Sequence, residues 1–283
     1  MAGRIQRTVI HRHPVARLST QRSLRRHSRI SSTGSPLRWP QQVGTAVAHY
    51  RDSGVIVRTH KLGEADRILS IITESNGKVR AVAKGVRKTR SRYGGRLELL
   101  RHLDLQFYKG RGDLDIVTQA ETRDHWPQVR DNLDRLGKAL TIAEAVDQIA
   151  QDKQPDQELY RMLCGALNTL EKSDPALIVP AFMLKLLAHE GVAPALDQCV
   201  VCGETTNLEF FDSAAGGVTC IAHQRGRTIS SSALELMRAT LGGALAAVLE
   251  VQPAPHTDEV TSITHRLWEF HIERRLRSTE LLQ

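Results

Sequence analysis

The sequence predicts an α+β protein in which a small barrel of five strands precedes an α-helical domain. Three observations support this architecture. Short apolar runs that alternate with polar residues fill positions 54–122, as is typical of half-buried strands. From Asp131 onward, apolar residues recur at spacings of three and four, which is the period of an amphipathic helix. A segment at about 197–228 with paired cysteines interrupts the helical pattern, and we expect it to form a hairpin.

The five expected strands follow one another closely along the chain. They cover residues 54–57, 68–73, 78–84, 103–108 and 114–120. Asn76-Gly77, between the second and third strands, is the strongest short-range hairpin signal. The glycines at 110 and 112 mark the turn before the last strand. Five strands of this size fit the OB-fold, a partly open barrel whose strand 2–3 face and loops bind oligonucleotides or oligosaccharides.

Five helices are expected in the second half. Apolar stripes run through 133–150 and 159–170, and Pro175 and Pro180 mark a break before a third helix around Phe182. Residues 233–248 and 258–278 supply two more. Cys164 lies within the second stripe, where a small core residue is the expected role.

Charge is distributed unevenly along the 283 residues, whose net charge is +8. Residues 1–49 carry nine arginines and no acid (+9), residues 50–125 carry +6, and residues 126–283 carry −7. Such an asymmetry indicates an anionic partner for the N-terminal half. We therefore divide the chain into a basic extension (1–49), an OB-fold nucleic-acid-binding domain (50–127) and a helical domain (128–283).

The extension is predicted to be disordered, because it lacks acids and any sustained hydrophobic period. Three interpretations remain open: a transit peptide, a basic arm that adds nucleic-acid affinity, or a start site assigned too early, with Val43 or Val47 as the true first residue.

No apolar run in the chain approaches the ~20 residues of a membrane span. Four cysteines are too few for a disulfide scaffold, which favours a reducing compartment and a cytoplasmic protein.

The cysteine segment carries the most specific signal. Cys199 and Cys202 have two residues between them, as do Cys220 and His223, and seventeen residues separate the two pairs. This is the ligand spacing of a structural zinc ribbon or knuckle. A redox pair is disfavoured because the βαβ pattern of such proteins is absent, and chance spacing is the remaining alternative. The sequence therefore predicts one zinc ion, held by a hairpin of 208–211 and 216–219.

No catalytic constellation is present. Four protein ligands close a zinc tetrahedron and leave no position for water. The signatures of a nucleobase deaminase, a P-loop, a dinucleotide-binding turn and a nucleophile elbow are all missing from the chain. We expect a protein that is not an enzyme.

A second signal is a basic run in residues 77–96. It contains eight cations and no acid until Glu98, namely Lys78, Arg80, Lys84, Arg87, Lys88, Arg90, Arg92 and Arg96. Phosphates neutralise such a density of charge, so the run predicts a nucleic-acid surface; the alternative is a solvated loop. Tyr93 is the only ring within it, which predicts binding to the backbone without sequence preference. The loops that OB-folds commonly use carry Lys61, Lys109 and Arg111.

Residues 58–68 (RTHKLGEADRI) and 77–90 (GKVRAVAKGVRKTR) closely resemble the start of bacterial RecO proteins, DNA repair and recombination mediators of which the actinobacterial type fits best. The late Cys-x₂-Cys insertion strengthens the resemblance, which covers residues 50–283. It implies an OB-fold, a helical domain and an embedded zinc site. It also implies binding of single- and double-stranded DNA, annealing of complementary strands, and loading of RecA together with RecR on DNA coated by single-strand-binding protein.

The resemblance transfers a DNA-contacting patch to Lys84, Arg87, Lys88, Arg90 and Arg92, and metal positions to Cys199, Cys202, Cys220 and His223. Two departures stand out: His223 occupies a position where cysteine is common, and residues 1–49 have no counterpart, which favours the misassigned start. A zinc-containing RNA-binding or transcription-associated OB-fold protein is the alternative function. The sequence places no contacts for RecR or single-strand-binding protein, and it gives neither oligomeric state nor stoichiometry.

Overall fold

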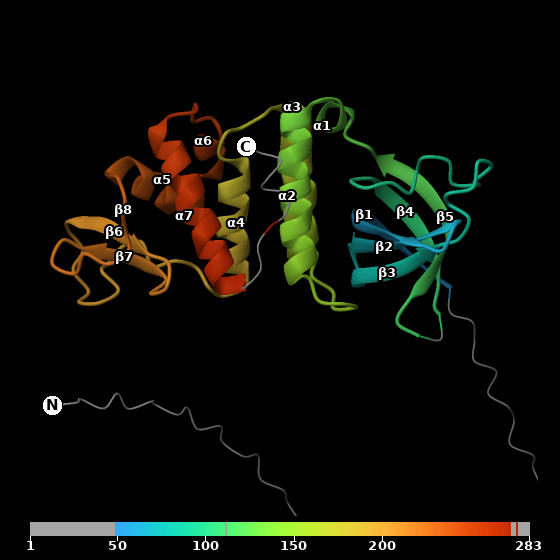
Figure 1. Ribbon diagram of the computed structural model, residues 1–283, viewed down its shortest axis with the longest axis horizontal. Helices are drawn as coiled ribbons and strands as arrows, with labels where there is room; N and C mark the ends of the chain where they lie inside the picture. Colours follow the sequence, from blue (N-terminus) through green and yellow to red (C-terminus); the bar gives the residue numbers. More distant parts are fainter. Residues whose placement is uncertain (1–48, 111, 273–275, 277–283) are drawn as a thin grey trace, which may run out of the picture. The chain divides into compact units, whose positions relative to one another are not determined.

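The computed structural model describes residues 49–110, 112–272 and 276. The predicted extension lies outside the described residues, apart from His49. The first half of the described chain is a closed barrel in the order β1-β2-β3-β5-β4, with β4 pairing back onto β1 (Figure 1). Its strands are β1 (His49–Leu62), β2 (Asp66–Thr73), β3 (Gly77–Ala83), β4 (His102–Tyr108) and β5 (Asp115–Asp124). Antiparallel pairs, closed by one parallel β3–β5 contact, confirm the predicted OB-fold-like barrel.

The interior of the barrel is a separate apolar core. Alternate residues of each strand point into it, among them Leu69 and Ile71 of β2, Val79 of β3 and Phe107 of β4, all almost fully buried. β1 is longer than the four residues predicted, because its polar first residues pair with β4 while its second half pairs with β2. A bulge between Ile56 and Arg58 allows this one strand to serve both neighbours.

The second half is helical, as predicted, but the described residues form seven helices where five were expected, because residues 127–131 add a short helix and the fourth expected helix is divided. Pro180 lies in the first turn of α4, where an N–H has no intrahelical partner and proline costs little. Gly242 and Gly243 divide the fourth expected helix in two. The helices are α1 (Pro127–Asp131), α2 (Leu133–Ile149), α3 (Gln157–Lys172), α4 (Ile178–His189), α5 (Ser231–Leu241), α6 (Leu245–Leu249) and α7 (Pro255–Ile272).

Side-chain caps fix the starts of three helices. Asn132, Asp156 and Ser230 each accept a hydrogen bond from the backbone N–H three residues later, which satisfies one of the orphan donors at a helix N-terminus. In the described residues, no helix is both long and apolar enough to cross a membrane.

A small sheet follows α4 and forms the predicted hairpin. β6 (Leu208–Asp212) pairs antiparallel with β7 (Gly217–Cys220). The structure adds a short edge strand, β8 (Arg227–Thr228), on the other side of β6. Gly226 must be glycine here, because a Cβ at this position would lie 1.9 Å from the carbonyl oxygen of Phe211.

A second apolar core joins the outer surface of the barrel to the helices, and the described residues all belong to a single compact unit. Val55, Val57 and Ile72 on the outer surface of the barrel belong to the same buried cluster as the helical residues. Polar contacts reinforce this joint. His102 of β4 stacks on Trp126 with nearly parallel rings, and its Nε2 lies 2.8 Å from the hydroxyl of Tyr160 on α3.

Burial at this joint makes part of the stability dependent on pH. Desolvation, assisted by Arg123, lowers the pKa of His102. A lowered pKa means that the folded state disfavours protonation, so the stabilisation is present above the unfolded pKa of about 6.5 and is lost as pH falls. We expect the difference in unfolding free energy between wild type and His102→Gln to shrink as pH falls from 7.5 to 5. Urea titrations at four pH values measure it, and a constant difference would contradict this assignment.

Candidate metal centre and nucleic-acid interface

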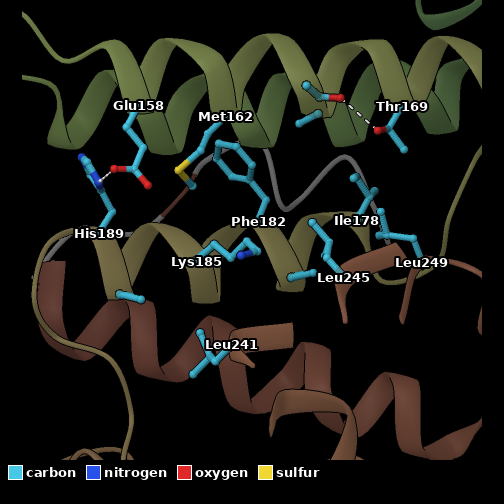
Figure 2. Close-up of a pocket in the computed structure, with 14 residues that line it drawn as sticks. Glu158, Met162, Thr169, Ile178, Phe182, Lys185, His189, Leu241, Leu245 and Leu249 are labelled. Carbon is cyan, nitrogen blue, oxygen red and sulfur yellow. Dashed lines mark hydrogen bonds and ion pairs between the residues drawn. The ribbon is translucent and has the colours of Figure 1, made fainter. Parts of the chain in front are cut away.

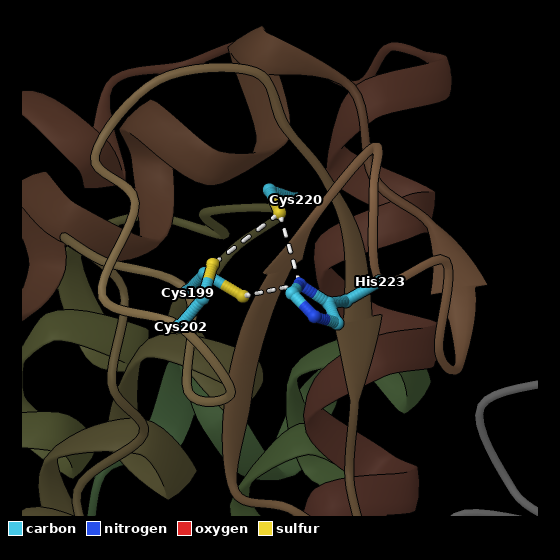
Figure 3. A group of neighbouring side chains, drawn as sticks. All are labelled: Cys199, Cys202, Cys220 and His223. Carbon is cyan, nitrogen blue, oxygen red and sulfur yellow. Dashed lines mark hydrogen bonds between the residues drawn. The ribbon is translucent and has the colours of Figure 1, made fainter.

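The four residues predicted as metal ligands come together at one end of the small sheet (Figure 3). Their ligand atoms all lie within 4.8 Å of one another. The sulfurs of Cys202 and Cys220 are 3.7 Å apart, and the Nδ1 atom of His223 lies 3.4 Å from the Cys220 sulfur. A tetrahedral zinc ion with Zn–S bonds of about 2.3 Å sets its sulfurs ~3.8 Å apart. The arrangement therefore fits such an ion.

Backbone hydrogen bonds shape the two turns that present these ligands. In the first turn, the Gly203 N–H donates to the Cys199 carbonyl at 2.9 Å, and Gly203 has a φ of +78°, which glycine adopts without strain. In the second, the His223 N–H donates to the Cys220 carbonyl at 2.8 Å. The Val200 N–H donates to the Val218 carbonyl and ties the first turn to β7. The sheet thus holds the two ligand pairs close enough together to bind one ion.

The electrostatics of the cluster favour a thiolate ligand. Desolvation raises the pKa of Cys199, but backbone N–H groups of Cys220 and Cys202 outweigh it and lower the pKa to about 6. For Cys202, the Glu204 N–H lowers the pKa, yet desolvation and the neighbouring sulfurs raise it overall. Several thiolates at this spacing repel one another unless a cation joins them. Three thiolates and one imidazole form a donor set that zinc accepts.

The eight predicted DNA-binding cations occupy two parts of the barrel. Lys78 and Arg80 lie on β3, and the other six lie in the connection between β3 and β4. Arg80, Lys84, Lys88 and Arg90 are exposed, and no hydrogen bond or ion pair joins their side chains to other described residues. Arg87 is exposed as well and donates to the carbonyl of Gly63 at 3.0 Å.

Three of the eight have roles within the fold. Lys78 is mostly buried; its Nζ lies 3.6 Å from the carboxylate of Asp147 and 3.8 Å from that of Asp152. The guanidinium of Arg96 donates to three backbone carbonyls, including that of Ala120 on β5. Arg92 is exposed, but its guanidinium stacks 4.7 Å above the Tyr93 ring. Lys78 and Arg96 thus have few donors left for a ligand.

The connection that carries the cations is anchored to the barrel. Tyr93 is buried and donates to the Val117 carbonyl at 2.6 Å, so the one ring of the basic run is not available for stacking on bases. The Gly85 N–H donates to the carboxylate of Asp66, and the Arg87 N–H to the Ala65 carbonyl. These bonds hold the start of the connection against the turn between β1 and β2.

The strand register adds a cation that the sequence analysis did not select. Arg58 of β1 lies opposite Ser70 of β2, which lies opposite Arg80 of β3. All three are on the outer surface, because the residues before and after Ser70 point into the barrel core. Together with the exposed cations of the basic run, Arg58 and Arg80 form a surface that we call the cationic face. It consists of Arg58, Arg80, Lys84, Arg87, Lys88 and Arg90. The sequence carried no signal for Arg58, because three apolar residues precede it and the bulge between Ile56 and Arg58 sets its register.

The loops expected to contribute were those of Lys61, Lys109 and Arg111. Lys61 and Lys109 are exposed, and Arg111 lies outside the described residues. Lys61 pairs with Arg67 in the last part of the β1–β2 hairpin, next to the turn on which the Arg87 backbone is anchored. The hairpin therefore extends the cationic face at the same end of the barrel.

Comparisons with known proteins agree with this architecture. Residues 47–126 match the family described as Recombination protein O N terminal, and residues 130–280 match Recombination protein O C terminal. The chain belongs to the RecO family of DNA repair proteins. It is 39% identical to DNA repair protein RecO of Bifidobacterium adolescentis over 246 residues and 36% identical to that of Streptomyces griseus over 245. These matches cover 82% and 83% of this chain and 98% of each relative.

The helical half of this RecO-family chain also has an apolar hollow of about 700 Å³ (Figure 2). Met162 of α3 and Phe182 of α4 face one another in it, and α5 and α6 add leucines. At one end, the ring of His189 lies 3.7 Å from the carboxylate of Glu158, while Lys185 provides a cation. No residue in the sequence marked this hollow in advance, because its lining comes from four separate helices.

The metal centre yields a direct prediction. We expect Cys202→Ser to lower the bound zinc to well below one ion per chain and to lower the Tm by about 5 °C or more, because a structural zinc site contributes folding free energy. Metal analysis by mass spectrometry and calorimetry measure the two effects. Cys164→Ser is the matched control, since Cys164 lies on α3 away from the cluster, and it should retain the metal. Full metal content and unchanged Tm in Cys202→Ser would contradict the assignment.

Proposed function

We propose that this chain is a recombination mediator without enzymatic activity that binds single- and double-stranded DNA and anneals complementary strands. It helps to load RecA in partnership with RecR, and it acts in the cytoplasm at the nucleoid. The observation that carries the proposal is the cationic face on an OB-fold-like barrel. At least four of its cations have no partner among the described residues, and DNA phosphates supply the missing charge.

Binding at this face is dominated by the DNA backbone. Lysine and arginine side chains neutralise phosphates and release condensed counterions, whichever bases are present. The burial of Tyr93 removes the ring that would stack on unpaired bases. A surface of this kind accepts single and double strands alike. By neutralising the phosphates of two strands, it lowers their mutual repulsion and so favours annealing.

The role proposed for zinc is structural. One ion held by Cys199, Cys202, Cys220 and His223 would cross-link the loop after α4 to the end of β7. A closed set of four protein ligands leaves no site for a substrate or water, so the ion contributes to stability rather than chemistry.

The hollow between α3 and α4 is the proposed contact for single-strand-binding protein. Concave apolar surfaces with a few polar groups at the rim are typical peptide and ligand sites. The lining of this hollow lies entirely on the helical half, and no residue of the cationic face contributes to it. A partner held there leaves the barrel free to contact DNA.

The DNA-binding proposal predicts the effect of removing charge. We expect the triple variant Arg87→Ala, Lys88→Ala, Arg90→Ala to bind all DNA sequences more weakly and to flatten the slope of log K against log salt by about 2. Each phosphate that the protein no longer neutralises takes ~0.7–0.9 from that slope. Fluorescence anisotropy at four salt concentrations measures both effects. Annealing of complementary oligonucleotides coated with single-strand-binding protein should slow in parallel.

A matched control removes the same charge elsewhere. Arg161, Lys172 and Arg266 are exposed on helices of the other half, and their triple alanine variant should keep nearly wild-type affinity and slope. If both triple variants weaken binding equally, the effect is one of net charge and the cationic face is not the interface.

The hollow gives an independent prediction. Gly165 lines the hollow, and a Cβ at this position meets no atom within 4 Å, so Gly165→Phe should fill the space without a backbone clash. We expect this variant to lose most of its affinity for single-strand-binding protein while its DNA affinity stays unchanged. Gly165→Ala is the control, which should keep partner binding and raise stability by up to about 1 kcal/mol. Isothermal titration with wild-type affinity for Gly165→Phe would refute the placement.

A further inference from the structure

Asp147 of α2 lies at the contact between the helices and the barrel, and its carboxylate is nearly buried. One oxygen accepts a hydrogen bond from Nη1 of Arg58 at 3.1 Å. The other lies 3.6 Å from Nζ of Lys78, which also donates to the Asp147 backbone carbonyl at 2.8 Å. A single carboxylate from the helical half therefore contacts two cations on neighbouring parts of the barrel.

The two cations differ in how much of each side chain remains accessible to a ligand. The side chain of Lys78 is only 15% exposed, whereas that of Arg58 is 54% exposed. One guanidinium nitrogen of Arg58 is bound by Asp147, and its other N–H groups have no partner among the described residues. Arg58 lies in the same row of the outer surface as Arg80, two strands away. A guanidinium held at one nitrogen can still present its remaining donors to a phosphate.

We propose that Asp147 is a positioning residue for DNA binding, which fixes the guanidinium of Arg58 on the cationic face. This inference rests on the proposed DNA-binding function. A free arginine must lose side-chain entropy when it binds a phosphate. Because Asp147 holds Arg58 in place before DNA arrives, much of that cost is met during folding. The helical half thus contributes to an interface to which it supplies no cation.

A positioning role and a purely electrostatic role for Asp147 predict opposite changes in DNA affinity when the carboxylate is removed. Removing a carboxylate makes the surface more positive, which by Coulomb attraction alone tightens the binding of a polyanion. Loss of positioning weakens it. Asp147→Asn adds one unit of positive charge whatever its partners, and Asp152→Asn adds the same unit close by. The difference between the two variants therefore isolates the positioning effect, which we expect to be the larger.

The test measures the affinity of the full chain for a fluorescent single-stranded oligonucleotide. We expect Asp147→Asn to weaken binding about two- to tenfold, the range set by ordering one long side chain, without a change in the salt slope because every cation is still present. The fold should persist, because Lys78 keeps its bond to the backbone carbonyl. Asp152→Asn is the matched control: it removes the same charge from Lys78 without touching Arg58, and its affinity should be unchanged or slightly higher.

Combining Asp147→Asn with a substitution of Arg58 distinguishes a positioning role from a general loss of structure. In the Arg58→Gln variant, Asp147→Asn should have no further effect on DNA affinity, because the residue it positions is gone. Arg58→Lys keeps the charge but loses the guanidinium fork, and it should weaken binding to a similar extent as Asp147→Asn. This variant stays informative if Asp147→Asn is poorly folded, because Arg58 is at the surface.

The outcomes distinguish this inference from the proposed function. Unchanged or tighter binding by Asp147→Asn overturns the inference, as does equal weakening in the Arg58→Gln background or wild-type affinity in Arg58→Lys. If the Arg87, Lys88 and Arg90 triple variant also binds like wild type, the proposed function itself has failed. If only that triple variant weakens binding, the function stands and the role of Asp147 does not.

Discussion

The packing of α2 against β1 determines which part of the barrel surface remains accessible. Val55, Val57 and Ile72 are on the outer surface of the barrel, yet they are buried in the core that the helices form. Farther along β1, Arg58 emerges at the exposed part of that surface, level with Arg80 of β3. The apolar contact therefore sets the edge of the cationic face, so the helical half determines which part of the barrel is accessible.

Local patterns in the sequence predicted most of the elements, because alternation and helical period are properties of neighbouring residues. The barrel, the hairpin and the gathering of Cys199, Cys202, Cys220 and His223 all followed from such patterns. Contacts between distant segments were not predictable in this way. Lys78 looked like any other cation of the basic run, and only the approach of α2 shows that Asp147 and Asp152 contact it.

The same limit explains which binding features were missed. Arg58 was not selected because it stands outside the dense run of charge, and strand register alone brings it level with Arg80. The apolar hollow could not be predicted from the sequence, because its lining is spread over α3, α4, α5 and α6. Conversely, Tyr93 was expected within the binding run, but its ring anchors the β3–β4 connection to Val117. The basic run thus contains exposed side chains and side chains that hold its own backbone in place.

At Gly77, the contact between the barrel and the helical half leaves no room for a side chain. Its φ of +66° suits the tight turn before β3, and an added Cβ would lie 1.8 Å from the carbonyl oxygen of Gln154 in the loop after α2. The next residue, Lys78, accepts a hydrogen bond from the Lys153 N–H at its own carbonyl. Any larger side chain at 77 would force that loop outward and disturb the contact between the two halves. Glycine at position 77 is therefore required by the space between β3 and the loop after α2, whatever the charges nearby.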